Sequence, residues 1–324
     1  MKRYILKRTI YLFITIVLIL SFNFFLFKVL PGDPIRLMFP RGAPQETIDL
    51  WRHILGLDKP LWEQYITAIV GAFTGDLGVS IRFAPRVPIS TILLPYVLKT
   101  VFLCGVGTIL SIFIGIIIGR EAAWKKGKRY DKWATSLSVI TYSIPTFLYA
   151  LFFIVIFAAV LPDWPLQDAS SPIDEFEKLD LFGKILDVSQ HAFLPIISLV
   201  IESLAGFSLI IRSSLIDVLT EDYILTAEAK GLDEKQILKK HAMPNAYLPV
   251  LADIAMNVGW IMGGTIMIEY IFTYKGLGYL SWEAVLCYDF PVLQATFVLE
   301  VVAVLIANFI ADIMNFYLDP RVKL

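Results

Sequence analysis

The sequence predicts an all-α integral membrane protein with six transmembrane helices. Three observations support this prediction: the composition, six long apolar runs, and the uneven distribution of Lys and Arg among the connecting segments. Of the 324 residues, 57% are hydrophobic and 18% are charged, and the mean hydropathy is +0.70. A soluble domain carries about 25% charged residues, so we expect nearly all of this chain to lie in or near a membrane.

The first apolar run, Thr9–Phe27, follows the basic residues 1–8. A basic segment before an apolar run is also typical of a cleaved signal peptide. However, at about 1.5 Å per residue this run is long enough to cross the hydrocarbon core of a membrane. No small-residue cleavage site follows it, and we therefore expect a retained first span.

Five further apolar runs have the length of transmembrane helices. They are Tyr96–Gly119, Ala134–Leu161, Ala192–Ile211, Leu248–Phe272 and Val292–Leu318. Six spans place both ends of the chain on the same side of the membrane. We expect Pro145 and Pro195, which lie in or at the edge of two of these runs, to kink or start their helices.

Basic residues indicate which side is cytoplasmic. Lys and Arg gather in residues 1–8, 120–132, 212–247 and 319–324, which a six-span arrangement places on one side. The opposite side holds an acidic loop with Asp163, Asp168, Asp174, Glu175, Glu177, Asp180 and Asp187 against Lys178 and Lys184. Because cytoplasmic loops are enriched in Lys and Arg, we expect cytoplasmic termini and a location in the plasma or inner membrane of the cell.

The predicted spans divide the chain into segments. Residues 1–30 are expected to form the cytoplasmic amino terminus and first span, 31–95 an outer subdomain, 96–318 the membrane core, and 319–324 a cytoplasmic tail. Within the outer subdomain, residues 46–55 have the pattern of an amphipathic helix. A second helix is expected to begin at Pro60 and run through Phe73, before a turn at Gly75–Gly78.

The cytoplasmic loop 212–247 is the most informative segment. Its pattern predicts a helix over Asp217–Lys230, and Gly231 suits the position after a helix end because glycine adopts positive φ without strain. Asp233 is expected to cap a second short helix, which Pro244 helps to end. Leu232, Ile237 and Leu238 form an apolar ridge on an otherwise charged surface. This ridge packs either on the protein's own helices or against a cytoplasmic partner.

The spacing in this loop resembles the cytoplasmic signature of permeases from binding-protein-dependent ABC importers. That signature is Glu-Ala-Ala, three residues, Gly, nine residues and Ile-x-Leu-Pro. Here Gly231 and Pro244 keep the spacing, although Leu225-Thr-Ala227 and His241-Ala-Met-Pro244 replace the flanking groups. Other motifs are similar to the B-type subunit of the dipeptide, oligopeptide and nickel branch: Leu30–Pro34, Leu55–Pro60, Gln64-Tyr65, Gly75–Gly78, Ala229–Leu232, His241 with Asn245, Tyr274–Gly278, Asp289–Pro291 and Leu318–Arg321. The acidic outer loop matches no such motif.

The resemblance implies a type I ABC importer permease fold with a cytoplasmic coupling helix. It implies a second, C-type permease, two ATPase subunits and an extracytoplasmic solute-binding protein as partners. The residues implied to dock the ATPase are Ala227, Glu228, Ala229, Gly231 and Leu232. The sequence has no Gly-x-x-x-x-Gly-Lys-[Ser/Thr] phosphate loop. We therefore expect no enzyme activity and no cofactor on this chain, with ATP and Mg bound by partner subunits.

Ionisable residues inside apolar runs mark candidate transport sites, because charges there cost about 2.5–3.5 kcal/mol on insertion scales. Glu202 is the first candidate for the substrate path, where it would face a substrate amine, and Glu300 is the second. The alternative for both is a protonated or paired glutamate that holds helices together. Asp312 is expected to pair with a basic residue or the backbone near a cytoplasmic helix end.

Other functional classes receive less support. The net charge of −1 gives no basic field for nucleic acid, and the scattered His and Cys residues show no metal-ligand spacing. A stand-alone secondary transporter would predict inverted repeats or clustered ion ligands, and neither is recognised. Peptides are the substrates that the resemblance implies first, and nickel or oligosaccharide remains an alternative.

Overall fold

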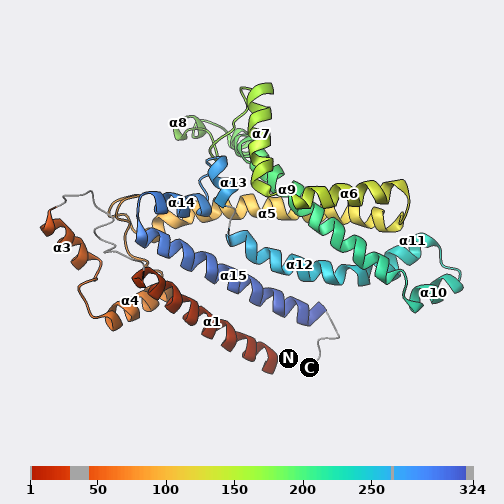
Figure 1. The fold of residues 1–324 in the computed structure, drawn as a ribbon, viewed down its shortest axis with the longest axis horizontal. Helices are drawn as coiled ribbons and strands as arrows, with labels where there is room; N and C mark the ends of the chain where they lie inside the picture. The colour runs from red at the N-terminus through yellow and green to blue at the C-terminus, as the bar shows by residue number, and fades with distance from the viewer. Residues whose placement is uncertain (1, 30–43, 264–265, 319–324) are drawn as a thin grey trace.

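The computed structural model describes residues 2–29, 44–263 and 266–318, and helices make up most of this length (Figure 1). The body contains the long helices α1 (Lys2–Val29), α5 (Ile89–Trp124), α9 (Leu181–Val218), α12 (Met243–Gly263) and α15 (Phe290–Leu318). Helix α5 packs extensively on α9, while α15 packs on both α12 and α1. A membrane offers no hydrogen bonds to the backbone, so a chain this apolar pairs its N–H and C=O groups within helices.

Apolar helices of spanning length confirm most of the predicted runs. Within the described residues, four single helices are long and apolar enough to cross a membrane. They are Tyr4–Lys28, Ile89–Trp124, Leu181–Val218 and Phe290–Ile310. A fifth span results if α6 (Arg129–Ser143) and α7 (Thr146–Val160) are counted together. The remaining predicted run, Leu248–Phe272, is divided between α12 and α13 (Ile266–Ile271), and residues 264–265 lie outside the described part.

The third predicted span is not a straight helix. Helices α6 and α7 meet at an angle of 94°, and α7 projects from the body (Figure 1). Pro145 is the residue that precedes α7, and Ile144 before it is extended with ψ 124°. A residue before proline avoids the helical conformation for steric reasons. The expectation that Pro145 starts or kinks a helix is therefore confirmed, whereas α9 continues through Pro195.

The outer segment contains the two short helices that the sequence predicts. They are α3 (Gln45–Ile54) and α4 (Leu61–Thr74), with Pro60 immediately before the first turn of α4. Gly75 follows α4 with a φ of 79°, as the predicted turn requires. Helix α5 begins earlier than the predicted second span, at Ile89, and residues 30–43 lie outside the described part of the chain.

A buried carboxylate joins this outer segment to the corner between α14 (Leu277–Leu286) and α15. Asp289 Oδ2 accepts hydrogen bonds from the Ser80 hydroxyl at 2.6 Å and from the backbone N–H groups of Ile81, Arg82 and Phe83 at 3.0, 2.9 and 3.0 Å. Asp289 and Ser80 are both fully buried. The sequence places these residues more than two hundred positions apart, so their contact is a product of the tertiary structure.

The acidic outer loop between α7 and α9, which includes α8 (Ile173–Phe176), folds back on the protein. The Asp187 carboxylate accepts a hydrogen bond from the Ser171 backbone N–H at 3.0 Å. Asp168 forms an ion pair with Lys275 at 2.8 Å, and its backbone N–H donates to the Phe272 carbonyl at 3.0 Å. The Asp187 bond therefore ties the loop to the start of α9, and the Asp168 contacts attach it to the segment that follows α13.

Close packing of α5 on α9 depends on glycine at the contact. A Cβ atom at Gly119 would lie 2.2 Å from the Ser208 carbonyl oxygen and 2.3 Å from Ile211 Cγ2. Both distances are far below van der Waals contact, and one of the opposing atoms belongs to the backbone. Any side chain at Gly119 therefore forces the two helices apart.

The Gly119→Ala variant is expected to lose about 1–3 kcal/mol of stability through overpacking. Thermal unfolding of the purified protein in detergent measures this loss. Gly105 is a matched control in the same helix, because a Cβ atom there meets nothing within 4 Å. Gly105→Ala should leave the unfolding temperature unchanged or slightly raised, since alanine is the better helix former. Equal unfolding temperatures for the two variants would contradict this account.

Candidate functional site

Residues 219–242 join α9 to α12 and are called the connecting segment below. It contains α10 (Asp222–Ala229), α11 (Glu234–Gln236) and a π-helical turn, η1 (Ile237–Ala242), which leads directly into α12. The segment lies at the end of the molecule opposite α14 (Figure 1). It corresponds to the loop in which the sequence predicts a docking element.

Gly231 ends α10 in the way the sequence predicts. Its φ is +78°, and its N–H donates to the Glu228 carbonyl at 2.9 Å while the Leu232 N–H donates to the Ala227 carbonyl at 3.3 Å. This pair of bonds is the Schellman arrangement that satisfies the last carbonyls of a helix. A Cβ atom at Gly231 would meet nothing within 4 Å. Glycine is therefore favoured here by the backbone conformation and not by crowding within the chain.

The predicted helix boundaries around Gly231 are partly correct. Asp233 caps the next helix as expected, since its carboxylate accepts from the Gln236 N–H at 2.6 Å. The single helix predicted over Asp217–Lys230 is wrong, because α9 ends at Val218 and residues 219–221 form a turn before α10. Beyond this turn α10 packs on η1, a tertiary contact that local periodicity does not reveal.

Pro244 does not end a helix, in contrast to the prediction. It is the second residue of α12, which follows the π turn η1 without interruption. Proline lacks an N–H, and its ring crowds the carbonyl of the fourth preceding residue. A π turn lets the helix continue past such a position because its hydrogen bonds reach back one residue further.

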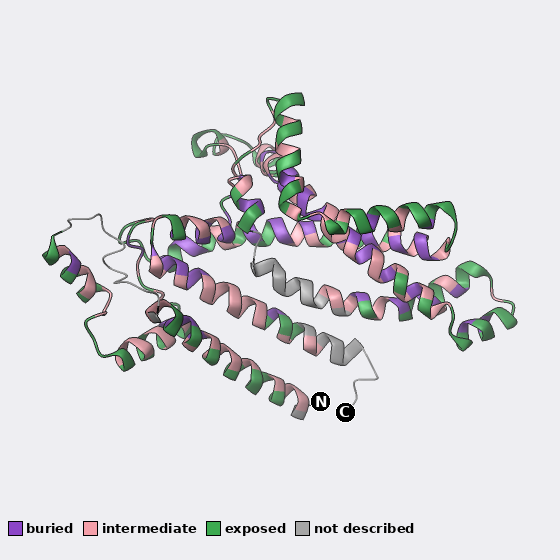
Figure 2. Ribbon diagram, viewed as in Figure 1, coloured by how far each residue is buried: buried purple, intermediate pink, exposed green. Residues whose placement is uncertain are grey.

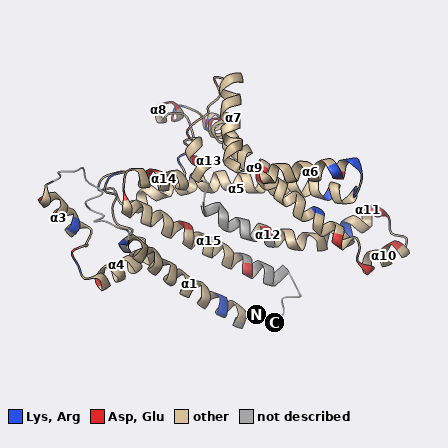
Figure 3. Ribbon diagram, in the orientation of Figure 1, with Lys and Arg blue, Asp and Glu red and all other residues tan. Residues whose placement is uncertain are grey.

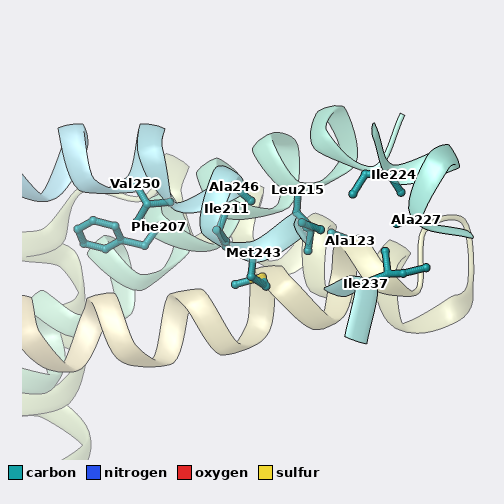
Figure 4. Close-up of a cluster of buried hydrophobic side chains, with 11 residues drawn as sticks. Ala123, Phe207, Ile211, Leu215, Ile224, Ala227, Ile237, Met243, Ala246 and Val250 are labelled. Carbon is teal, nitrogen blue, oxygen red and sulfur yellow. The ribbon is translucent and has the colours of Figure 1, made fainter. Parts of the chain in front are cut away.

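One side of the connecting segment is buried in the protein's own core. Ile224, Ala227 and Ile237 lie in a cluster that also contains Leu215 of α9 and Ala123 of α5 (Figure 4). The cluster continues along α9, η1 and α12 through Phe207, Ile211, Ala242, Met243, Ala246 and Val250. The cluster therefore connects the segment to three long helices of the body.

The predicted docking residues divide into buried and exposed members. Ala227 is buried at 4% exposure, whereas Glu228, Ala229 and Gly231 are exposed and Leu232 is half-buried. The whole connecting segment shows this mixture of buried and exposed positions (Figure 2). The apolar ridge divides as well, because Ile237 is buried while Leu232 and Leu238 are partly exposed at the edge of the cluster. Packing on the protein's own helices thus explains why Ala227 and Ile237 are apolar. The residues around Gly231 remain exposed and form a surface that a partner could contact.

A partly buried ion pair, which the sequence pattern does not indicate, joins α9 to the first turn of α6, next to the α5–α6 turn. Arg212 of α9 donates to the two Asp131 carboxylate oxygens from Nε at 2.6 Å and from a terminal nitrogen at 3.0 Å. Asp131 also accepts from the Gly127 N–H at 2.8 Å and the Thr135 hydroxyl at 3.1 Å. Lys and Arg gather at this turn (Figure 3). The bidentate pair fixes the basic turn to the end of α9.

Glu202 lies on α9, which packs on both α6 and α7. Its carboxylate accepts a hydrogen bond from the hydroxyl of the neighbouring Ser203 at 3.3 Å. The residue is half-buried. Among the residues that the structure describes, no ion pair joins Glu202 to a Lys, Arg or His side chain.

Glu300 lies in a different environment from Glu202. It accepts a hydrogen bond from the Ser281 hydroxyl at 3.3 Å and so connects α15 to α14. Nearby Glu269 of α13 was missed among the ionisable residues of the apolar runs. It is fully buried and accepts from the Thr100 hydroxyl at 2.7 Å and the Tyr279 N–H at 2.9 Å. Its position within the predicted fifth run was the signal that could have identified it.

Asp312 forms an ion pair with Arg8 of α1 at 2.9 Å, which confirms the expectation of a basic partner. The first and last helices of the chain are therefore joined by charge as well as by packing.

The chain is similar to a family of membrane transport components and to named permease proteins. Residues 111–324 match the model of the binding-protein-dependent transport system inner membrane component, and residues 1–90 match the amino-terminal model of such membrane components. The dipeptide transport system permease protein DppB of Escherichia coli K12 is 32% identical and the alignment covers 100% of this chain and 99% of DppB. The oligopeptide transport system permease protein AppB of Bacillus subtilis is 32% identical with full coverage of both chains.

A third relative and a solved structure agree with these matches. The glutathione transport system permease protein GsiC of Shigella flexneri is 30% identical, over 100% of this chain and 99% of GsiC. Among solved structures, an inward-facing form of the MetNI methionine ABC transporter matches with a TM-score of 0.57 at 16% identity. That match covers 71% of this chain and 97% of the other, and it shows a shared fold.

Proposed function

Because the chain belongs to the family of binding-protein-dependent transport system inner membrane components, we propose that it is the B-type permease subunit of an ATP-driven importer. It forms half of a translocation path, which a second, C-type permease completes. Two ATPase subunits bind ATP and Mg²⁺, and an extracytoplasmic binding protein delivers the solute. Full-length similarity to three peptide-system permeases is the observation that carries this proposal.

In the proposed topology the chain crosses the membrane six times, with both ends in the cytoplasm. The charge distribution supports this orientation, since the basic segments 120–132 and 212–247 fall on the same side. The broken pair α6 and α7 accounts for the third span and α12 with α13 for the fifth. The connecting segment then faces the cytoplasm, and the Asp289 corner faces outward.

We propose that the end of α10 and the residues after it, around Gly231, form the coupling helix, and that their exposed surface docks in the ATPase. Glu228, Ala229, Gly231 and Leu232 would form the contact, because the small residues among them allow close approach. Ala227 lies beneath this surface, in the buried cluster with Ile237 and residues of α5, α9 and α12. The proposed docking surface therefore lies directly on the packed hydrophobic cluster.

The packing of this cluster suggests how ATP-driven movement of the connecting segment is transmitted to the membrane helices. Packed cores change arrangement as units and do not deform continuously. The cluster joins the connecting segment to α5, α9 and α12, and the Asp131–Arg212 pair adds the α5–α6 turn to this unit. A push on the coupling helix would thus tilt these helices together and open the path on the other side.

The transported solute is proposed to be a di- or oligopeptide. The names of the relatives specify dipeptide, oligopeptide and glutathione systems, and all three solutes are peptides. Glu202 is proposed to lie on the path. The geometry of Glu300, which bonds Ser281 within the same subunit, favours the alternative of a tie between helices.

Purification of the tagged chain from its native membrane in mild detergent tests the proposal. We expect a second permease and ATPase chains to co-purify, and the preparation to hydrolyse ATP. Reconstituted into liposomes with the binding protein, the complex should take up a radiolabelled peptide but not nickel or an oligosaccharide. A lone chain without ATPase, under conditions that preserve a known complex of this kind, would overturn the importer assignment.

A further inference from the structure

Helix α4 belongs to the segment that the sequence pattern places outside the membrane, yet it packs along the first spanning helix, α1. Near the start of α4 the Tyr65 ring meets Phe24 edge-on with centroids 5.5 Å apart, and its hydroxyl shares a hydrogen bond with Ser21 at 2.7 Å. Near the end of α4 the Phe73 ring stacks on Phe13 at 5.8 Å. As α4 advances, its partners on α1 therefore fall from position 24 to position 13.

Contacts with α15 mark the two ends of α1. Arg8 pairs with Asp312 near the cytoplasmic end, and the Phe27 ring contacts Phe290, the first residue of α15, at 6.3 Å. Positions 8 and 27 are about 28 Å apart along a helix, which matches the hydrocarbon core of a bilayer. By the same rise Phe13 lies about 21 Å below Phe27. The end of α4 thus reaches below the outer boundary of this core.

A stripe of apolar side chains on α4 is left uncovered by the chain. Trp62, Ile66, Val70 and Phe73 recur at helical spacing and have exposed fractions of 61, 50, 53 and 53%. Residues 64–74 contain no charged side chain. A helix that lies flat in the headgroup region typically carries Lys and Arg along its polar face, and α4 lacks such a face beyond its first turn.

Helix α3 provides a comparison within the same outer segment. It also exposes apolar side chains, with Leu50 at 55% and Ile54 at 49%. However, α3 packs next to Phe290 at the outer end of α15, and it carries the ionisable residues Glu46, Asp49, Arg52 and His53. Exposure alone therefore does not distinguish the two helices. They differ in depth along the spanning helices and in charge.

We propose that α4 is inserted into the outer leaflet as a re-entrant helix, with Trp62, Ile66, Val70 and Phe73 in contact with lipid acyl chains. A helix of 14 residues is about 21 Å long, too short to cross the core and return as one element. The stripe continues the lipid-facing surface of α1, because Phe73 stacks on Phe13 and the latter is itself 57% exposed. This insertion anchors the outer segment in the bilayer, independently of the transported solute.

The return of the chain from α4 fits this position. Gly75 turns the backbone with a φ of 79°. A Cβ atom at Gly71 would lie 2.4 Å from the Asp76 carbonyl oxygen, so the returning chain lies directly on α4. Leu77 then packs against the apolar cluster of α5, α14 and α15. Irregular backbone at membrane depth is tolerated only where protein covers it, and these contacts supply that cover.

Photochemical cross-linking identifies what covers the stripe. A photoreactive benzoylphenylalanine replaces Val70 or, as the matched control, Leu50, which is equally exposed. The full chain, with the subunits that accompany it, is placed in nanodiscs of phosphatidylethanolamine and phosphatidylglycerol and irradiated. We expect mass spectrometry to find lipid adducts at position 70 and few at position 50. Cross-links from position 70 to another protein chain in place of lipid, or equal lipid adducts from both positions, would overturn the proposal.

Thiol labelling in the same nanodiscs gives a second readout. Cys104 and Cys287 are replaced by alanine, and a single cysteine is introduced as Ile66→Cys or Leu50→Cys. A membrane-impermeant maleimide should modify position 66 roughly tenfold more slowly than position 50, because an apolar environment disfavours the reactive thiolate. Solubilisation in denaturing detergent should equalise the two rates. Equal rates in the intact nanodisc would place α4 in water and contradict the insertion.

Discussion

Replacing Gly231 with Trp is expected to remove the ATPase subunits from the purified complex, with at least a tenfold drop in co-purified ATP hydrolysis. The indole would project from the proposed docking surface, where the backbone at φ +78° currently carries no side chain. Within the chain itself nothing lies within 4 Å of the added Cβ. The damage should therefore appear in the partner contact and not in the packing of this subunit.

A control separates the bulk of Trp from strain in the backbone. A residue with a Cβ pays roughly 1–2 kcal/mol in the left-handed conformation, and Asn tolerates it better than most. Gly231→Asn should consequently keep most of the ATPase association. The quantities to measure are the ATPase-to-permease ratio after affinity purification and the unfolding temperature of the permease. Normal ATPase retention by Gly231→Trp would show that this surface is not the docking site.

Asp289→Ala is expected to release the outer segment from the α14–α15 corner. The substitution leaves the buried Ser80 hydroxyl and the N–H groups of Ile81, Arg82 and Phe83 without their acceptor. Each such group costs about 1–3 kcal/mol while it stays buried. We expect the loop to open toward solvent instead, at a net cost on the order of a few kcal/mol.

Trypsin reports this opening directly, because Arg82 and Arg86 lie in the released loop. Cleavage after these residues should be much faster in Asp289→Ala than in the wild type, and the unfolding temperature should fall. Asp163→Ala is the control, since Asp163 is an exposed acid on the outer loop. Asn at position 289 retains one oxygen acceptor and should show an intermediate effect. Unchanged cleavage in Asp289→Ala would mean that other contacts hold the segment.

The connecting segment shows where prediction from sequence succeeds and where it ends. Gly231 and Asp233 were predicted correctly, because a helix end and a helix cap depend on residues within a few positions. The turn at 219–221 and the helix that continues through Pro244 were not predicted. Both depend on how the segment packs against α9 and α12, which the local pattern does not contain.

The candidate transport residues show the same limit. Glu202 and Glu300 look alike in sequence, as single carboxylates in apolar runs. The structure places Glu202 on α9, where its printed partner is the adjacent Ser203, and Glu300 on α15, where it bonds Ser281 of α14. Their different proposed roles follow from these neighbours and not from their own chemistry.

Hydropathy and short motifs are enough to predict that the chain is a helical membrane protein, where most of its apolar helices lie, and which family it resembles. These properties follow from hydropathy and short motifs, because a membrane selects helices by the composition of a continuous stretch. The joining of Asp289 to the outer segment, the burial of Ala227 and the pairing of Arg212 with Asp131 depend on the tertiary structure. Such contacts join residues far apart in sequence, and their free energy depends on geometry that no local pattern specifies.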